Sequence, residues 1–482
     1  MNIYPINISM DKIFWIQPEN TQLGNWQKQI TELSGSPSFC VLPWIHLATR
    51  PNGDMRICCV ANASGAETGD YTVGLVKTEN GNPANFSQLL PSEAFNNDYM
   101  KSVRKTMLEG NIPVTCIKCY EEEEQGVASK RIWETGTWHF DGVDIPELID
   151  QTEEDGSVPF TLQYLDLRLG HTCNLKCIMC SPHDSSLWVP DHKKVFPIFQ
   201  STLIKKQMSW DQSEFNNNWH ENPKFWEEIY EQIPNIKQLY FAGGEPLISK
   251  EHKIFLQEII KRGYANKISI RYNTNGILVT DELIEIWNHF RKVKVGVSID
   301  ALEERLHYIR YPSDWKIIEE NLHKLDNTKE HIHVNIALAA QLLNIKHIPN
   351  FIKWKVKSNF KKVNFERNVV GQLQGGGLIG VHLIWIPTWL SLRVLPKKDK
   401  QHVRNLFNEL KDWLWDNYTQ DEEFWITNPY GWKRWEGILD WMDNEDHTNL
   451  LPDFREYIQT MDKQRNTNFK LTFPELAHLL DV

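Results

Sequence analysis

The chain has 482 residues, more than a single hydrophobic core usually organises, so we expect two or three domains. Its formal net charge of -11 at pH 7 argues against nucleic acid as a partner, because phosphate contacts need a basic face. The N-terminus lacks the basic and apolar runs of a signal peptide, and the longest apolar segment, 378–395, is interrupted by His382, Pro387 and Arg393. We therefore predict a cytoplasmic protein without a membrane span.

After an N-terminal segment, 1–35, that carries no motif, a predicted domain at 36–140 holds a cysteine-rich hairpin. Its strands, 44–49 and 54–60, are joined by a Pro-Asn-Gly turn, and a helix is expected near 97–108. In a reducing compartment we interpret the cysteines here as metal ligands: Cys40, Cys58, Cys59, Cys116 and Cys119. Because side chains alternate across a strand, only one of Cys58 and Cys59 is expected to join a given cluster. Four ligands suit an iron-sulfur cluster or a structural zinc site.

An acidic linker, 141–157, leads to a predicted barrel domain at 158–390, in which apolar runs alternate with amphipathic segments. The runs predict six strands, at 162–169, 238–242, 267–273, 293–299, 333–339 and 362–365. Helices between them, as at 250–261 and 281–290, predict a parallel β/α repeat with right-handed connections. We interpret an insertion at 189–234 as a helical layer rather than a substrate lid. The C-terminal region, 391–482, is predicted to be helical, with helices at 398–418 and 428–441.

Three motifs follow the first three barrel strands, where active residues of such barrels lie. Cys173, Cys177 and Cys180 have the spacing Cys-x3-Cys-x2-Cys after the first strand, GGEP at 243–246 follows the second, and TNG at 274–276 follows the third. Three thiolates leave a metal one protein ligand short, and an open position is where a substrate or cofactor binds. The alternative for the triplet is a zinc site completed by His171 or His183.

This combination of motifs resembles the radical S-adenosylmethionine (SAM) superfamily. The resemblance implies an α/β fold with a partial (β/α)6 barrel of the TIM type, and SAM bound to a [4Fe-4S] cluster held by Cys173, Cys177 and Cys180. The N-terminal hairpin and helix resemble a SPASM or twitch domain, which implies an auxiliary [4Fe-4S] cluster on the other cysteines. In that family the module most often follows the barrel, whereas here it precedes it.

The resemblance also assigns residues to SAM. It places Met179 against the adenine, the GGEP segment at the methionine amino group, and Arg310 on the methionine carboxylate. Gln341 and Asn344 are weaker candidates for the same pocket. The full set of predicted SAM-binding residues is Met179, Gly243, Gly244, Glu245, Pro246, Thr274, Asn275, Ser298, Asp300 and Arg310.

The expected activity is reductive cleavage of SAM to a 5′-deoxyadenosyl radical that abstracts hydrogen from a substrate. An external electron donor such as flavodoxin or ferredoxin would be needed. One substrate class is a ribosomally made peptide, matured by crosslinking, epimerisation or excision with a separate leader-recognition protein. The alternative is a small molecule such as a sugar, amino acid or nucleoside. A cysteine hydrogen donor would require Cys58 or Cys59 to reach the active site, which we do not expect. The motifs identify no catalytic residue of the substrate reaction.

Overall fold

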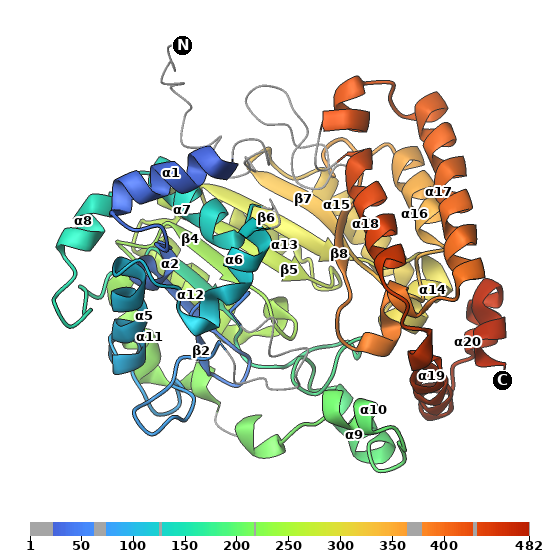
Figure 1. The fold of residues 1–482 in the computed structure, drawn as a ribbon, viewed down its shortest axis with the longest axis horizontal. Helices are drawn as coiled ribbons and strands as arrows, with labels where there is room; N and C mark the ends of the chain where they lie inside the picture. The colour runs from blue at the N-terminus through green and yellow to red at the C-terminus, as the bar shows by residue number, and fades with distance from the viewer. Residues whose placement is uncertain are drawn as a thin grey trace.

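The computed structural model describes residues 23–61, 74–124, 128–215, 218–363, 378–427 and 431–481. Within these residues an eight-stranded sheet, in the order β2-β1-β3-β4-β5-β6-β7-β8, runs through the molecule (Figure 1). All neighbouring strands are parallel except β1 and β2. The strands are β1 (His46–Thr49), β2 (Met55–Arg56), β3 (Tyr164–Leu167), β4 (Gln238–Phe241), β5 (Ser269–Thr274), β6 (Lys292–Ser298), β7 (Ile332–Ala340) and β8 (Gly380–Leu383).

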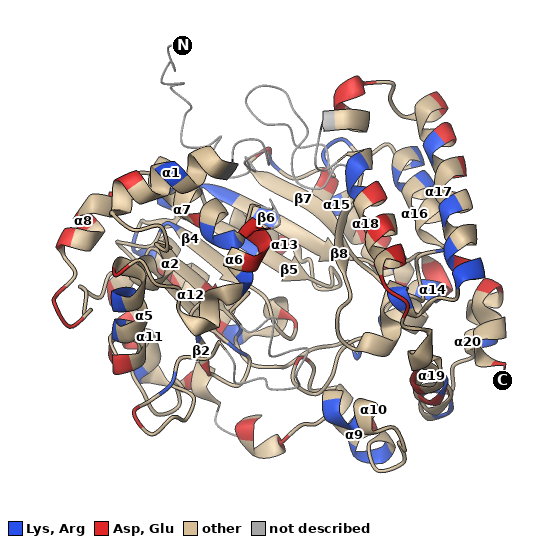
Figure 2. Ribbon diagram, in the orientation of Figure 1, with Lys and Arg blue, Asp and Glu red and all other residues tan. Residues whose placement is uncertain are grey.

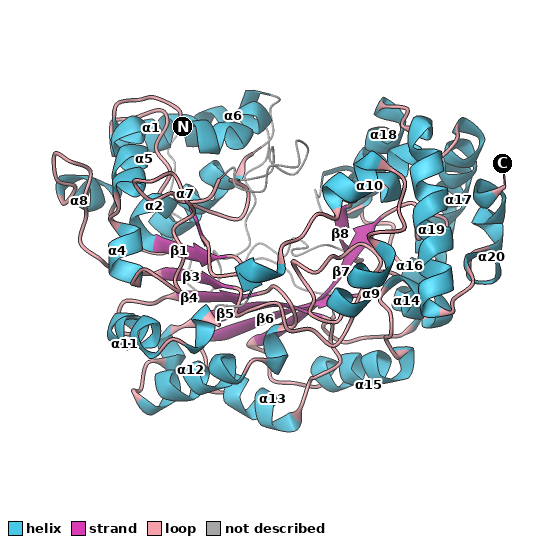
Figure 3. Cartoon of the chain, turned by 90° about the horizontal axis from the view of Figure 1, so that it is seen from below, coloured by secondary structure: helices cyan, strands magenta, loops and turns pink. Residues whose placement is uncertain are grey.

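Helices between successive parallel strands cover one face of this sheet, as Figure 3 shows for α11, α12, α13 and α15. These connections and the parallel order confirm the predicted α/β fold with a partial barrel. The barrel helices are α11 (Pro223–Gln232), α12 (Lys250–Lys261), α13 (Asp281–Trp287), α14 (Glu303–Ile309), α15 (Trp315–Asp326) and α16 (Ile348–Lys357). The barrel core includes apolar side chains of these strands and helices, among them the fully buried Trp287.

The predicted strand at 362–365 is wrong for the residues that the structure describes. Residues 361–363 form a turn, and residues 364 and 365 lie outside the described part. The Asp326 carboxylate at the end of α15 accepts the backbone N–H groups of Lys361 and Lys362 at 2.8 and 2.9 Å, which holds this turn. The strand that pairs with β7 is instead β8, at the start of the apolar segment 378–395.

The N-terminal hairpin is confirmed, and it extends the barrel sheet. Residue His46 of β1 lies opposite Tyr164 of β3 in a parallel ladder, and β2 pairs antiparallel on the other side of β1. The second strand is shorter than predicted, so Cys58 and Cys59 lie in the turn that follows it. The helices around the hairpin are α1 (Leu23–Ser34), α2 (Leu42–Ile45), α4 (Pro91–Phe95), α5 (Asp98–Leu108), α6 (Ile117–Glu124), α7 (Lys130–Phe140) and α8 (Ile145–Asp150). Of these, α8 lies in the predicted linker, and the domain boundaries remain predictions.

The insertion and the C-terminal region are helical, as predicted. The insertion supplies α9 (Trp188–Val195), α10 (Thr202–Gln207) and α11, and the C-terminal helices are α17 (Lys397–Asn417), α18 (Trp432–Asn444), α19 (Leu451–Arg465) and α20 (Phe469–Thr472). Figure 2 shows acidic and basic residues interspersed along α17 and α18, which is typical of solvated helix faces. Among the described residues, no helix combines the length and the apolar character that a bilayer span needs.

Candidate active site

The loop at 171–180, which we call the cluster loop, carries the cysteine triplet directly after β3. Its backbone is held from several elements: Lys176 N–H donates to Tyr311 O at 2.6 Å, and Ile178 N–H donates to Ile309 O at 2.7 Å. The Trp188 indole N–H donates to Cys177 O at 2.8 Å. These bonds use polar groups of the loop backbone, and the Leu175 N–H also donates to Cys173 Sγ at 3.4 Å, so the loop conformation is fixed mainly by backbone contacts to distant elements.

The three thiols of the cluster loop are partly or fully buried. Cys177 is 5% exposed, and a hydrogen bond from the Cys180 thiol lowers the pKa of Cys177 despite this burial. Arg310 acts in the same direction, since its Nη1 lies 4.0 Å from the Cys177 sulfur. Burial raises the pKa of Cys173 to about 12. The positive charge of Arg310 therefore lies where a thiolate ligand needs it.

The GGEP segment after β4 packs directly on the cluster loop. Gly244 has a φ of +49°, and a Cβ there would lie 2.4 Å from the Thr172 carbonyl oxygen. The next residue, Glu245, donates its N–H to the same oxygen at 2.8 Å. Glycine is required at 244 because no side chain fits between the two backbones. Pro246 opens a short 3-10 helix, Pro246–Ile248, that leads away from the loop.

Glu245 joins the loops after β3, β4 and β5. Its carboxylate accepts hydrogen bonds from Thr274 Oγ1 and from the Asn275 N–H, both at 2.7 Å. Asn275 in turn donates to Asn174 Oδ1 of the cluster loop at 2.7 Å. Because the side chain is only 3% exposed, burial raises the pKa of Glu245 to about 7. The structure thus brings three of the predicted motifs together.

Asp300 and Arg310 form a buried ion pair beside the cluster loop. Arg310 Nε lies 2.7 Å from Asp300 Oδ2, and the Asp300 side chain is fully buried. Although burial opposes its charge, Asp300 raises the pKa of Arg310 above its usual range. Asn344 donates to Asp300 O at 3.0 Å, which places this weaker candidate in the same network. Ser298 ends β6, and Gln341 is fully buried just after β7.

A cavity of about 970 Å³ opens beside the cluster loop and is lined by Met179 and Cys180. Three arginines on one of its walls were missed by sequence reasoning: Arg50, Arg56 and Arg168. Arg168 follows β3 and lies two residues after Asp166. Because side chains two residues apart lie on the same face of a strand, this alternation could have placed Arg168 on the face of Asp166. Arg50 and Arg56 flank the hairpin turn, and only the pairing of β1 with β3 brings them to this cavity.

C-terminal residues that support the cluster loop were also missed. The Tyr457 hydroxyl of α19 donates to Ile178 O at 2.7 Å. Asp191, only 3% exposed, pairs with Lys176 of the loop at 2.9 Å and with Arg465 of α19 at 3.3 Å. More than 250 residues separate Asp191 from Arg465 in the chain. No local pattern in the sequence could have predicted this contact.

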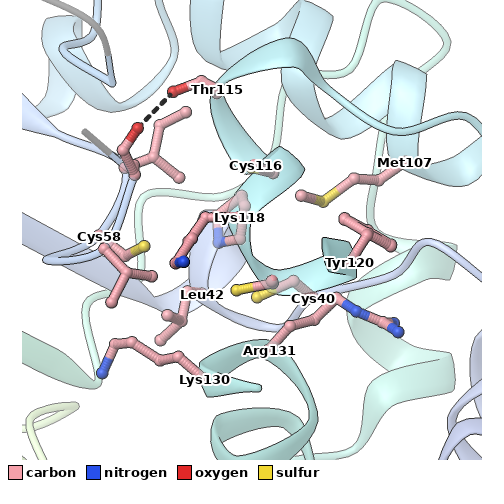
Figure 4. Close-up of a pocket in the computed structure, with 15 residues that line it drawn as sticks. Cys40, Leu42, Cys58, Met107, Thr115, Cys116, Lys118, Tyr120, Lys130 and Arg131 are labelled. Atoms are coloured by element: carbon pink, nitrogen blue, oxygen red, sulfur yellow. Dashed lines mark hydrogen bonds between the residues drawn. The ribbon is translucent and has the colours of Figure 1, made fainter. Parts of the chain in front are cut away.

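A second cysteine site lies in the N-terminal part of the molecule. Cys40, Cys58, Cys116 and Cys119 line one cavity, which Figure 4 shows together with Met107 and Tyr120. Of the adjacent pair, Cys58 is the one that lines this cavity. Cys59 interacts electrostatically with Arg168, which follows β3, and with Arg271 of β5. Cys59 lines neither this cavity nor the cavity beside the cluster loop, so a role as hydrogen donor stays unexpected.

The spacing of the cysteine sulfurs bears on the kind of metal site. Within the described ranges, one group of three possible metal ligands has its ligand atoms within 4.8 Å of one another: His220, Glu221 and Glu251. No three cysteine sulfurs of these ranges lie so close together. Tetrahedral zinc, with zinc–sulfur bonds of about 2.3 Å, would hold its sulfurs roughly 3.8 Å apart. No three of the described cysteine sulfurs have the mutual spacing of a closed zinc site.

Residues 167–350 match the family model described as "Radical SAM superfamily", which confirms the predicted resemblance for the barrel. A tungsten-containing aldehyde ferredoxin oxidoreductase cofactor-modifying protein of Pyrococcus furiosus is 28% identical over 142 residues, covering 29% of this chain and 32% of that protein. A GTP 3',8-cyclase of Clostridium botulinum is 25% identical over 148 residues, covering 30% and 36%. The chain thus matches about a third of the length of these curated relatives.

Two solved structures are similar at low scores. Native anSMEcpe with bound AdoMet has a TM-score of 0.34 and 18% identity, covering 54% of this chain and 64% of that chain. Streptococcus suis SuiB bound to S-adenosylmethionine has a TM-score of 0.34 and 14% identity, covering 72% and 68%. These scores are too low to support an argument about the site, which therefore rests on the residues described above.

Proposed function

We propose, on the premise that residues 167–350 form a radical SAM domain, that this chain cleaves SAM reductively and uses the resulting radical to modify a peptide. The observation that carries the proposal is the meeting of the cluster loop, the GGEP segment and the Asp300–Arg310 pair at the carboxyl ends of the barrel strands. These are the ends at which barrels of this kind carry their chemistry.

The residues present fit a [4Fe-4S] cluster and SAM. Cys173, Cys177 and Cys180 would hold the cluster and leave one iron without a protein ligand. When bound, the reduced cluster supplies the electron that splits SAM into methionine and a 5′-deoxyadenosyl radical, which takes a hydrogen atom from the substrate.

The protein residues bind and orient the reactants around that chemistry. Gly243 and Gly244 allow the GGEP segment to pack closely on the cluster loop and on Arg168, and Glu245 would attract the positive charge of the methionine amino group. Arg310 offers a planar cation to the methionine carboxylate. Met179 lines the cavity beside the loop, where it can contact an adenine ring and exclude water.

The second proposal concerns Cys40, Cys58, Cys116 and Cys119, which we assign to an auxiliary [4Fe-4S] cluster in a SPASM- or twitch-like module. Four cysteines that line one cavity suit an iron-sulfur cluster, and a structural zinc site is the alternative. When bound there, such a cluster would exchange an electron with a substrate radical.

The size of the cavity accommodates a short peptide segment as well as a small molecule, and we propose the peptide. Small-molecule sites occupy roughly 300–1,000 Å³, and the cavity of about 970 Å³ beside the cluster loop lies at the top of that range. We also propose two partners: a separate protein that recognises the leader of the peptide, and an external flavodoxin or ferredoxin that donates the electron. The similarity to GTP 3',8-cyclase keeps a small-molecule substrate as the alternative.

Anaerobic reconstitution with iron and sulfide tests this function. We expect about eight irons per chain from two four-iron clusters, and about four in a variant with alanine at Cys173, Cys177 and Cys180. The wild type should produce 5′-deoxyadenosine from SAM and dithionite, whereas the triple variant should produce none. Tightly bound zinc, or intact SAM after reduction of the wild type, would contradict the proposal.

A further inference from the structure

Three possible metal ligands from two elements meet beside the start of the cluster loop. His220 and Glu221 belong to a short 3-10 helix of the insertion, Trp219–Glu221, and Glu251 lies in the first turn of α12. One side-chain atom of each residue lies within 4.8 Å of the other two. Imidazole suits Zn²⁺ and carboxylates suit Mn²⁺, so this mixed set fits a divalent first-row metal ion.

The imidazole ring of His220 is held in place by its neighbours. A Cβ at Gly170, the residue before the cluster loop, would lie 2.8 Å from His220 Nε2, so the ring packs directly on that backbone. The preceding Trp219 is only 1% exposed, and its indole N–H donates to Pro51 O at 3.0 Å. The backbone carbonyl of His220 accepts the indole N–H of Trp226 at 2.7 Å. The segment that carries two of the ligands is therefore fixed by contacts that involve no metal.

The other ring nitrogen of His220 is directed at the Glu251 carboxylate. His220 Nδ1 is buried, makes no hydrogen bond with any residue that the structure describes, and lies 3.6 Å from Glu251 Oε2. This separation is too long for a hydrogen bond, but it leaves room for a metal ion that bonds to both atoms at about 2.0–2.2 Å. Glu251 is only 8% exposed, and its Oε2 accepts a hydrogen bond from Ser249 Oγ at 3.1 Å, which orients the carboxylate as an outer-shell partner does.

Lys250 pairs with both carboxylates of this group. Its Nζ lies 3.4 Å from Glu221 Oε1 and 3.5 Å from Glu251 Oε1. The Lys250 side chain is 70% exposed, so it can turn into solvent when another cation takes its place. Exchange of an exposed ammonium for a divalent ion strengthens the Coulomb attraction to the two carboxylates. The lysine thus marks a position at which this group already binds a cation.

We propose that His220, Glu221 and Glu251 bind a divalent metal ion through Nδ1 of the imidazole and one oxygen of each carboxylate, with water in the remaining positions. The ion replaces the Lys250 ammonium and ties the insertion to α12. Because His220 packs on Gly170, the ion also steadies the backbone that enters the cluster loop. This structural role goes beyond the proposed function and does not depend on SAM.

Manganese binding to the reconstituted protein tests this site. Mn²⁺ prefers carboxylates to thiolates, and loss of the hyperfine signal of free Mn²⁺ in electron paramagnetic resonance spectra reports its binding. We expect saturable binding by the wild type, weakened at least about tenfold in Glu221→Gln and Glu251→Gln, since even outer-shell partners contribute that much to metal affinity. Glu227→Gln, which removes an exposed carboxylate of α11, is the matched control and should bind as the wild type does.

Lys250→Gln distinguishes a metal site from a cluster of ion pairs. Removal of the competing ammonium should strengthen Mn²⁺ binding about fivefold, whereas Lys253→Gln, which removes another exposed charge of α12, should change it little. Excess Mn²⁺ should raise the melting temperature of the wild type but not that of Glu221→Gln, because the ion binds only the folded state. Glu221 is exposed, so its variant carries the test if the buried Glu251→Gln does not fold.

Three outcomes would overturn the metal site. Equal Mn²⁺ binding by the wild type and Glu221→Gln would indicate an adventitious ion only. Absence of saturable binding by the wild type would exclude the site, and weaker binding by Lys250→Gln would contradict the exchange of cations. None of these measurements involves SAM, so a protein that binds Mn²⁺ here but leaves SAM intact would contradict the proposed function and leave the metal site standing.

Discussion

The cluster loop and the N-terminal cysteine cavity differ in how their ligands are assembled. The cluster loop holds its three cysteines within ten residues, and hydrogen bonds from distant elements fix its backbone. The N-terminal cavity collects four cysteines from three separate segments, one before α2, one after β2 and two around the start of α6. A local ligand set is therefore visible in spacing alone, whereas a dispersed set becomes defined only when the chain has folded.

Replacing each of the two adjacent cysteines by alanine, in separate variants, tests this contrast most strongly. Cys58→Ala should lower the iron content from about eight to about four, because only Cys58 lines the N-terminal cavity. Cys59→Ala should keep about eight irons and serves as the matched control. Iron and sulfide counts with electron paramagnetic resonance spectra provide the measurement. Equal loss from both variants would show that the dispersed site is not the one described.

Gly244→Ala tests the close contact between the GGEP segment and the cluster loop. Its new Cβ would lie 2.4 Å from Thr172 O, so we expect SAM affinity to fall at least tenfold. Gly263→Ala is the control, since Gly263 also has a positive φ, +80°, but has no atom within 4 Å of the added carbon. That control should cost only about 1 kcal/mol of backbone strain. Similar SAM affinities in the two variants would argue against the contact.

The pH dependence of SAM binding follows from Glu245. Burial raises its pKa to about 7, so the carboxylate becomes protonated below pH 7 and loses its attraction for the methionine ammonium. We expect the dissociation constant of SAM to rise as the pH falls through 7, by up to about tenfold per unit. In Glu245→Gln the profile between pH 6 and 8 should be flat. Calorimetric titration measures it, and a flat wild-type profile would contradict this role.

Tyr457→Phe should have the smallest effect. It removes the hydroxyl that donates to Ile178 O at 2.7 Å and leaves that carbonyl unpaired, which costs about 1–3 kcal/mol. The melting temperature should fall by a few degrees and the cluster of the triplet should be lost more quickly in air. Tyr264→Phe, near the end of α12, is the control. An unchanged rate of cluster loss would mean that α19 does not stabilise the loop.

Periodicity and motif spacing predicted the strands from β3 to β7 and the meeting of the Cys triplet with the GGEP and TNG motifs. Periodicity failed at 362–365, where a single side chain determines the backbone conformation. The Asp326 carboxylate accepts the N–H groups of residues 361–363, which would otherwise be available to a strand. Periodicity and spacing also failed where charges meet only through strand pairing, as for Arg56 and Arg168. Such contacts depend on register, and register is set by the complete sheet.

The parallel pairing of β1 with β3 has a consequence for the integrity of the barrel. Without β1, the first barrel strand would expose a row of unpaired N–H and C=O groups, which is a template for association with other chains. The sheet instead terminates in β2, which is only two residues long and whose Met55 backbone is already hydrogen-bonded by Val76 and Ala84. The hairpin that contributes Cys58 therefore also covers the edge of β3. Removing it to study the barrel alone would expose that strand edge to pairing with other chains and favour aggregation.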